Sequence, residues 1–524
     1  MTFRLAASIL GFTMSLFGAS ASASVVQTGE GLVRGISAGD LRVYKGIPFA
    51  APPIGDLRWR EPQPVKPWEG VRSAKDFAPA CMQTGVSMPG EAQPVTSENC
   101  LYLNVWAPST HSVAPRAVLV WIYGGGFVNG SASMPLYWGD QLARKGIIVV
   151  TFGYRVGPFG FLANPELTAE SPHHSSGDYG FLDQIAALKW VQQNIAAFGG
   201  DPSRVTIAGQ SAGAASVSVL MASPLAKGLF KRAIAQSGGL FEPVQLAPNY
   251  FLANAEKEGV AYATSVGAKS LAALRALPTT ELLKGKAGEI SHPVINPYVL
   301  PLSPYDAFAA GLQNDAAILV GSNADEARSL ITDLDTVTAA GFESGITNRW
   351  GALPTQLLAA YPHTTDEEAR KARLGFERDL RFGWDIWAWA RLEAKKNTNP
   401  VYYYYFNHSP PFPVGSVYEG WGPSHFADLW YSFDHLDQYP SWHWTDSDSR
   451  LANDMSSYWV NFVKTGDPNG DGLPKWPRFT TGQASVLYLN DPVASGPVAN
   501  LDTLSVFDAV YTQVRGAPFG SAAH

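Results

Sequence analysis

Hydrophobic and polar positions divide the chain into short apolar runs and longer amphipathic stretches. Five runs rich in β-branched or aromatic residues are typical of strands: 117–122, 147–152, 205–208, 316–320 and 401–406. The clearest helical pattern lies between two of them, at residues 181–198, where apolar residues recur three and four positions apart and Gly199-Gly200 ends the pattern. Strands that alternate with helices predict an α/β fold, with a central, mostly parallel sheet and helices on both faces.

The stretch before these runs has a different pattern. Residues 25–49 alternate and turn like a β-hairpin, and we expect residues 35–40 to form the turn between strands at 32–33 and 41–44. No Pro/Ser-rich linker or charge run divides the rest of the chain. We therefore expect one domain over residues 24–524, opened by this N-terminal hairpin.

The first 23 residues have the pattern of a secretory signal peptide. Arg4 supplies the positive charge, residues 5–17 are mostly apolar, and residues 21–23 (Ala-Ser-Ala) offer a small-residue cleavage site. A membrane anchor is the alternative, but the apolar run is shorter than the ~20 residues that span a bilayer. We expect cleavage after Ala23, export to the periplasm or the exterior, and no membrane span in the mature chain.

Composition narrows the class of protein. Hydrophobic residues make up 46% of the 524 and charged residues 16%, which indicates a packed globular protein rather than a disordered one. Lys and Arg number 38 against 45 Asp and Glu, a net charge of −7, so no basic footprint for a nucleic-acid partner is expected. The sequence alone leaves the oligomeric state open.

The chain has two cysteines, Cys81 and Cys100. In an exported protein two thiols usually pair, because the compartment is oxidising. We expect a disulfide between them, with two buried free thiols as the alternative.

The pattern Gly-x-Ser-x-Gly, which can carry a nucleophilic serine, occurs twice, at residues 35–39 and 209–213. Such a serine needs a sharp turn between a strand and a helix. Ser211 has this context, since residues 205–208 are a predicted strand and residues 212–222 a small-residue helical pattern. Ser37 lies in the predicted hairpin turn. We therefore predict that Ser211 is the nucleophile and that Ser37 is a turn residue.

A serine that attacks an acyl group also needs N–H donors for the oxyanion. Residues 123–127 (Tyr-Gly-Gly-Gly-Phe) follow the strand predicted at 117–122. Three glycines let backbone N–H groups converge with no side chain in the way. We predict that this loop forms part of the oxyanion hole.

Several further motifs, in collinear order, resemble those of type-B carboxylesterases, the family that includes cholinesterases and p-nitrobenzyl esterases. The resemblance runs from about Gly31 to Phe479. Its motifs are YKGIPFA at 44–50, SENCLYLNV at 97–105, FGGDP at 198–202, QSG at 236–238 and TGDPN at 465–469. The resemblance implies the α/β-hydrolase fold and hydrolysis of carboxylic esters.

The resemblance also implies the partners of the serine. The segment 321–327 (GSNADEA) aligns with the family's acid motif and makes Glu326 the acid, although Ala327 replaces the usual glycine and Asp325 is the fallback. The segment 422–429 (GPSHFADL) makes His425 the base, with His408 and His435 as nearby alternatives.

The mechanism that the resemblance implies uses these three groups together. His425 takes the proton of Ser211, Glu326 orients the imidazole, and the N–H groups of Gly125, Gly126 and Ala212 bind the oxyanion. No cofactor is expected. The segment 467–472 begins like a calcium loop, but Arg478 stands where a bidentate glutamate is needed, so no metal is expected there either.

The substrate is a small-molecule ester whose identity the sequence does not give. The segment between Cys81 and Cys100 contains no aromatic residue, whereas cholinesterases place a cation-binding tryptophan there, so choline esters are disfavoured. Tyr123, Phe127, Trp384 and Trp421 are candidates for the pocket wall, with helix core as the alternative for Trp384. Such walls favour apolar or aromatic esters. Amides, thioesters and a non-catalytic binding role in the same fold are the alternatives.

Overall fold

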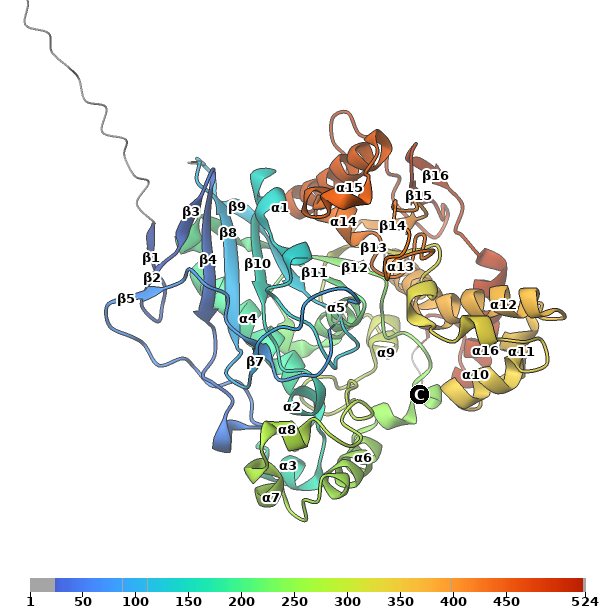
Figure 1. The fold of residues 1–524 in the computed structure, drawn as a ribbon, viewed down its shortest axis with the longest axis horizontal. Coiled ribbons are helices and arrows are strands. Elements are labelled where there is room, and N and C mark those ends of the chain that lie inside the picture. Colours follow the sequence, from blue (N-terminus) through green and yellow to red (C-terminus); the bar gives the residue numbers. More distant parts are fainter. Residues whose placement is uncertain (1–23, 87, 111, 397, 522–524) are drawn as a thin grey trace, which may run out of the picture.

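The computed structural model describes residues 24–86, 88–110, 112–396 and 398–521, and the predicted signal peptide lies outside them. A central sheet has eleven strands in the order β16-β15-β14-β13-β12-β11-β9-β10-β8-β4-β3 (Figure 1). The strands are β3 (Ile36–Ala38), β4 (Leu41–Pro48), β8 (Tyr102–Pro108), β9 (Arg116–Ile122), β10 (Ile148–Phe152), β11 (Gly200–Gln210), β12 (Arg232–Gln236), β13 (Ala317–Asn323), β14 (Val401–Phe406), β15 (Val486–Leu489) and β16 (Ala494–Gly496).

The middle of this sheet is parallel. The neighbouring pairs from β10 through β9, β11, β12, β13 and β14 to β15 all run in the same direction, while β8, β4, β3 and β16 are added antiparallel. Each of the five predicted strand runs lies within one of these strands, to within one residue at its start. The α/β prediction is therefore confirmed, and the carboxyl ends of β11, β13 and β14 meet at one edge of the sheet.

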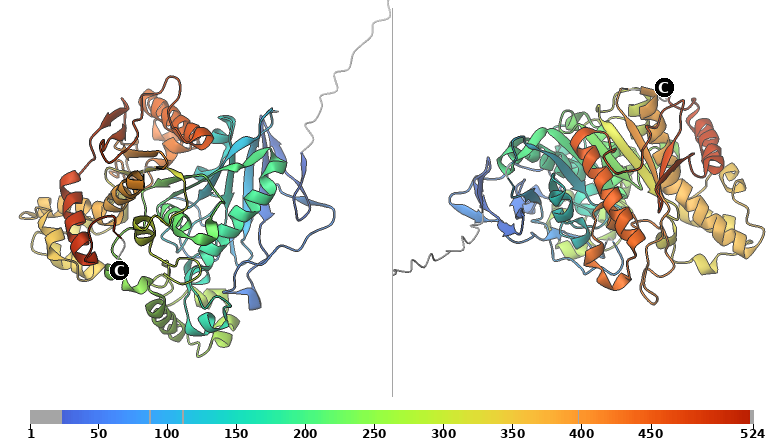
Figure 2. Two further views of the ribbon diagram at one scale, coloured as in Figure 1. Left: turned by 180° about the vertical axis from the view of Figure 1, so that it is seen from behind. Right: turned by 90° about the horizontal axis from the view of Figure 1, so that it is seen from above.

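Helices cover both faces of the sheet (Figure 2). On one face lie α4 (Tyr179–Asn194), α5 (Ala212–Ala222), α9 (Pro304–Ala309) and α13 (Trp384–Lys396); on the other lie α1 (Asp140–Arg144), α14 (Leu429–Ser432) and α15 (Asp446–Thr465). The predicted helix at 181–198 is α4 followed by the 3₁₀ turn Ile195–Phe198. Small side chains let α5 bury all but its last residue beside the sheet.

The N-terminal hairpin forms with a different register from the one predicted. Residues 36–38 are not a turn but the strand β3, which pairs antiparallel with β4 across a turn at Gly39-Asp40. Leu32–Arg34 (β2) instead pairs with Val25–Gln27 (β1) and with Val71–Ser73 (β5) in a separate sheet. Gly39 takes the left-handed turn conformation at φ 62°, so the chain reverses there, and Ser37 lies in a strand.

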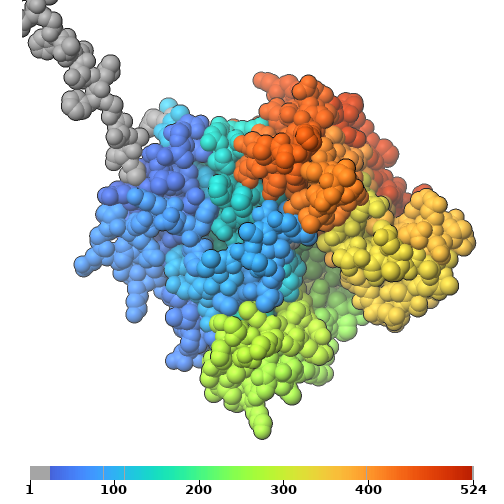
Figure 3. All heavy atoms as spheres, in the orientation of Figure 1, coloured from blue at the N-terminus to red at the C-terminus, as the bar shows by residue number. Residues whose placement is uncertain are grey.

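Two lobes extend from the carboxyl edge of the sheet. One contains α2 (Gly157–Phe161), α3 (Pro165–Glu170), α6 (Leu252–Ser265), α7 (Leu271–Ala276) and α8 (Thr279–Leu282); the other contains α10 (Phe342–Trp350), α11 (Thr355–Ala359), α12 (Asp366–Arg378) and α16 (Leu501–Arg515). Figure 3 shows the α6–α8 part of the first lobe in lime green and the α10–α12 part of the second in yellow to orange, with a recess between them. Within the described residues, no helix is both long enough and apolar enough to cross a bilayer.

Cys81 and Cys100 form the predicted disulfide, closing a loop with a sequence separation of 19. Both cysteines are buried. Inside the loop, Ala80–Cys81 (β6) pairs with Thr96–Ser97 (β7). The bridge therefore ties a long surface loop to the start of β8.

Removing this bridge should destabilise the protein. The double variant Cys81→Ser/Cys100→Ser should lose about 3 kcal/mol of unfolding free energy, because the unfolded chain gains the conformational freedom of the opened loop. Urea unfolding with and without a reductant measures this. Reductant should weaken the wild type and leave the double variant unchanged, and equal stability of the two proteins under oxidising conditions would contradict the expectation.

Candidate active site

Ser211 lies on the sharp turn between β11 and α5. Its backbone has φ 58° and ψ −126°, a strained conformation for a residue with a side chain. Close packing enforces this conformation, because a Cβ on Gly213 would overlap the carbonyl group of Ile122 at the end of β9, and one on Gly209 would overlap Gly213. The two glycines of the motif thus let the turn approach the neighbouring strand, and the serine side chain is lifted off the sheet edge.

The glycine loop after β9 lies directly against this turn. A Cβ on Gly124 would be 2.9 Å from the Cβ of Ser211. Gly125 and Gly126 have φ values of 116° and 61°, which favour glycine. Gly126 and Ala212 line the same cavity as Ser211. Two of the three residues expected to bind the oxyanion thus share a cavity with the serine, and Gly125 lies in the same glycine loop.

Glu326 and His425 come together at the same edge. Glu326 follows β13, and His425 lies in the loop between β14 and α14. The Nδ1 atom of His425 is 2.6 Å from Oε2 of Glu326, and Oε1 accepts a 2.7 Å hydrogen bond from the backbone N–H of Asn323. Both side chains are buried. The carboxylate therefore fixes the imidazole with Nδ1 as donor, which leaves Nε2 as the acceptor.

A buried polar network holds the His425 loop in place. The Asn323 side chain donates to the carbonyl of Ser424 at 2.7 Å, and Asp428 accepts from Gln236 at 2.8 Å and from the Tyr404 hydroxyl at 2.9 Å. Burial raises the pKa of Asp428, and nearby Glu326 raises it further, while these hydrogen bonds oppose the shift. Every strand from β12 to β14 thus contributes a side chain to the positioning of His425.

The fourth side chain at the site is Gln210, the residue before the nucleophile. Its amide nitrogen lies 3.1 Å from Nε2 of His425 and donates to it, given that Nδ1 donates to Glu326. The Gln210 side chain, rather than the Ser211 hydroxyl, is therefore the contact of Nε2 in the described residues. Gln210 lies inside the Gly-x-Ser-x-Gly motif at a position that the motif leaves unspecified, so the sequence pattern gave no signal of this contact.

The alternatives for acid and base have other partners. Asp325 forms an ion pair with Arg328. His408 contacts Asp448 at 2.8 Å, and Asp448 belongs to the capping box at the start of α15. His435 contacts Asp140 at 3.1 Å. Glu326 and His425 are the predicted acid and base that contact each other, and His425 also contacts Gln210, the residue before Ser211. Within the described residues, no group of three or more potential metal ligands is found.

Ser211 opens into a cavity of about 600 Å³ between the two lobes. Its apolar walls include Phe127, Leu246, Trp350, Leu353 and Phe382. The Phe382 ring stacks on the His425 imidazole, with centroids 4.5 Å apart. Sequence reasoning missed Trp350 and Phe382, because the fold alone brings these segments to the serine.

Of the four predicted wall residues, Phe127 lines this cavity and the other three do not. Tyr123 is buried, stacks on Tyr154 and exchanges hydrogen bonds with it. Trp384 packs in the core against Tyr511, and Trp421 packs against Phe412 and Tyr418. For Trp384, the structure therefore favours the helix-core alternative.

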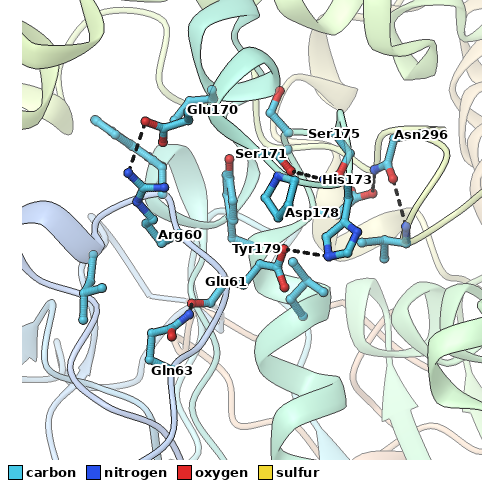
Figure 4. Close-up of a pocket in the computed structure, with 18 residues that line it drawn as sticks. Arg60, Glu61, Gln63, Glu170, Ser171, His173, Ser175, Asp178, Tyr179 and Asn296 are labelled. Atoms are coloured by element: carbon cyan, nitrogen blue, oxygen red, sulfur yellow. Dashed lines mark hydrogen bonds and ion pairs between the residues drawn. The ribbon is translucent and has the colours of Figure 1, made fainter.

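A second cavity, of about 420 Å³, lies away from the nucleophile (Figure 4). Glu61, His173, Asp178 and Asn296 are among its lining residues. Its acids already have partners, since Glu61 is 3.5 Å from His173 and Asp178 accepts hydrogen bonds from Asn296 and from the backbone of Val294. Burial holds the pKa of Asp178 well above its usual range, and the hydrogen bonds from Val294 and Asn296 oppose the shift.

Comparison with known proteins agrees with this geometry. The chain is 38% identical to the fumonisin B1 esterase of Sphingopyxis macrogoltabida over 492 residues, covering 90% of this chain and 87% of that protein. It is 33% identical to the para-nitrobenzyl esterase of Bacillus subtilis, covering 90% and 95%. A solved PNB esterase structure superposes with a TM-score of 0.78 at 30% identity, covering 93% of this chain and all of that one. Residues 22–500 match the carboxylesterase family. The chain therefore belongs to the carboxylesterase family and is a carboxylic ester hydrolase.

Proposed function

We propose that this protein is an exported serine carboxylesterase that hydrolyses apolar or aromatic esters through an acyl-enzyme on Ser211. The observation that carries the proposal is the buried 2.6 Å contact between His425 and Glu326, at the sheet edge where Ser211 is held in a strained turn. A serine, a base and an orienting acid are the groups that acyl transfer requires.

The reaction proceeds in two steps. Nε2 of His425 takes the Ser211 proton while the serine oxygen attacks the ester carbonyl, and the N–H groups of Gly125, Gly126 and Ala212 stabilise the oxyanion. His425 then gives the proton to the leaving alcohol. In the second step His425 activates a water, which releases the acid and restores Ser211. The Gln210 amide must withdraw from Nε2 for the serine hydroxyl to reach it.

The substrate preference rests on the walls of the cavity. Phe127, Trp350 and Phe382 offer aromatic surface beside the nucleophile. Amides and thioesters would use the same catalytic groups, so they are side activities of this site. Choline esters are disfavoured, because residues 82–99 supply no aromatic side chain to hold the cation.

The two Gly-x-Ser-x-Gly motifs provide a matched pair of variants for the nucleophile. Ser211→Ala should lower kcat for 4-nitrophenyl butyrate by about 10⁴-fold or more and abolish labelling by diisopropyl fluorophosphate. Ser37→Ala, in the same motif on strand β3, should retain both properties. Mass spectrometry of the labelled peptides checks the site. Labelling that persists in Ser211→Ala, or an unlabelled wild type without turnover, would contradict the proposal and favour a non-catalytic binding protein.

The contact between Gln210 and His425 predicts a pH effect. In Gln210→Glu a carboxylate beside Nε2 stabilises the imidazolium, which cannot accept the Ser211 proton. The acid limb of the kcat/KM profile should therefore move to higher pH, by about one pH unit. Gln210→Met removes the amide without adding charge, and its midpoint should stay near that of the wild type. Identical midpoints for the Glu and Met variants would show that residue 210 does not contact the base.

Export is part of the proposal. The disulfide between Cys81 and Cys100 supports it, because disulfides persist in oxidising compartments. Amino-terminal sequencing of the protein from its native host should give Ser24 as the first residue. An intact Met1 in a cytoplasmic fraction would contradict this part of the proposal.

A further inference from the structure

A short π-helical segment connects α12 to α13 and contributes three residues to the lining of the active-site cavity, Leu380, Arg381 and Phe382. The segment is Asp379–Gly383, and its Arg381 and Phe382 both line the cavity that contains Ser211. Phe382 is the ring stacked on His425. π-Helical turns are rare and occur frequently at functional sites. Arg381 thus puts a guanidinium group one residue from the ring that contacts the catalytic base.

The positive charge of Arg381 is incompletely balanced by its neighbours. Its ion-pair partner is Glu377, at 3.5 Å. This buried carboxylate also pairs with Arg373 at 2.5 Å and with Arg349 at 3.5 Å, so three guanidinium groups share one acid. Asp333, which is largely exposed, lies 3.9 Å from Arg373 and adds little negative charge to this cluster. Arg373 makes the shortest of these contacts with Glu377. The positive charge of Arg381 is therefore only partly neutralised, and an excess of positive charge remains towards the cavity.

The Arg381 side chain is held in place by aromatic rings. Its guanidinium carbon lies 5.4 Å from the centre of the Trp350 ring and 5.5 Å from that of Phe382, and both rings line the cavity. The side chain is 25% exposed. Burial and the nearby Arg349 lower the pKa of Arg381, whereas Glu377 and Glu326 oppose the shift. The Arg381 guanidinium is thus planar, fixed in position, partly shielded from water and only partly neutralised by nearby acids. Such a group suits a carboxylate, which it can bind through two parallel hydrogen bonds.

Three acidic residues line the same cavity, and each already has a partner. Glu289 pairs with Lys286 at 2.8 Å. Glu242 and Asp385 bond to each other, and burial raises the pKa of both, that of Asp385 most strongly. The Arg515 guanidinium opposes this rise in the pKa of both acids. These acids do not cancel the charge of Arg381.

We propose that Arg381 binds a carboxylate of the substrate, so that this enzyme prefers esters that carry a free carboxylate over their neutral counterparts. Half-esters of dicarboxylic acids have this group on the acyl side, and esters of hydroxy acids have it on the alcohol side. The inference rests on the proposed function, because it requires hydrolysis at Ser211. It adds a charged anchor to a cavity whose other walls are apolar or aromatic.

Two pairs of esters with nearly the same shape test the inference. Monobenzyl succinate is compared with benzyl 4-methylpentanoate, and 4-(butanoyloxymethyl)benzoate with 4-methylbenzyl butanoate. The quantity measured is the ratio of kcat/KM for the anionic ester to that for the neutral one, which does not depend on the fraction of folded enzyme. In Arg381→Gln this ratio should fall about tenfold or more for at least one pair, because a charge-assisted hydrogen-bonded pair is lost.

Arg370→Gln provides the matched control. This variant also removes one positive charge, but from helix α12, and Arg370 does not line the cavity. Its ratios should therefore equal those of the wild type. Arg381→Lys keeps the charge without the planar fork and should fall between the wild type and Arg381→Gln. The pair that responds shows which side of the ester carries the carboxylate.

The outcomes separate this inference from the proposed function. Ratios that stay unchanged in Arg381→Gln for both pairs, while the neutral esters are still hydrolysed, would overturn the role of Arg381 and leave the serine esterase intact. Wild-type enzyme that hydrolyses none of the four esters, and that diisopropyl fluorophosphate does not label, would overturn both.

Discussion

The strained turn at Ser211 is the constraint on which the active site depends. The residue keeps its positive φ because β11 and α5 are locked to β9 by contacts that only glycine permits at positions 209 and 213. The same closeness brings Gly124 against the serine. A looser turn would separate Ser211 from the N–H groups that we propose bind the oxyanion. Tight packing of the sheet and placement of the proposed catalytic groups therefore depend on the same contacts.

The rest of the catalytic apparatus is held by burial and hydrogen bonding. Glu326 and His425 come from segments 99 residues apart, and they meet because β13 and β14 are parallel neighbours that end at the same edge. Asn323 bonds to both segments, through its backbone to Glu326 and through its side chain to Ser424. A carboxylate and an imidazole buried this deeply need such support, since buried polar groups without hydrogen-bond partners are costly. The network therefore keeps the imidazole poised while the serine side of the cavity stays open.

Local patterns in the sequence predicted the features that depend on local physics. The five strand runs and the helix at 181–198 follow from hydrophobic periodicity. The structure has the predicted strand before Ser211 and the predicted helix after it, and the role of Ser211 as nucleophile belongs to the proposed function. The predicted register of the hairpin is wrong, because the chain reverses in a tight turn at Gly39-Asp40 and not in the longer turn that the pattern suggested. The cavity walls were largely missed. Trp350 and Arg381 line the cavity of Ser211 only because a lobe distant in the sequence packs there. Tyr123 instead packs in the core against Tyr154. No local signal in the sequence marked any of these placements.

Capture of the covalent intermediate tests the central claim most directly. Wild-type enzyme turning over 4-nitrophenyl butyrate would be quenched in acid within the first turnover and digested, and the peptide containing Ser211 would be weighed. The account predicts one butanoyl group on Ser211, formed at the rate of the initial 4-nitrophenol burst. A burst without that adduct, or a butanoyl group on another residue, would contradict it.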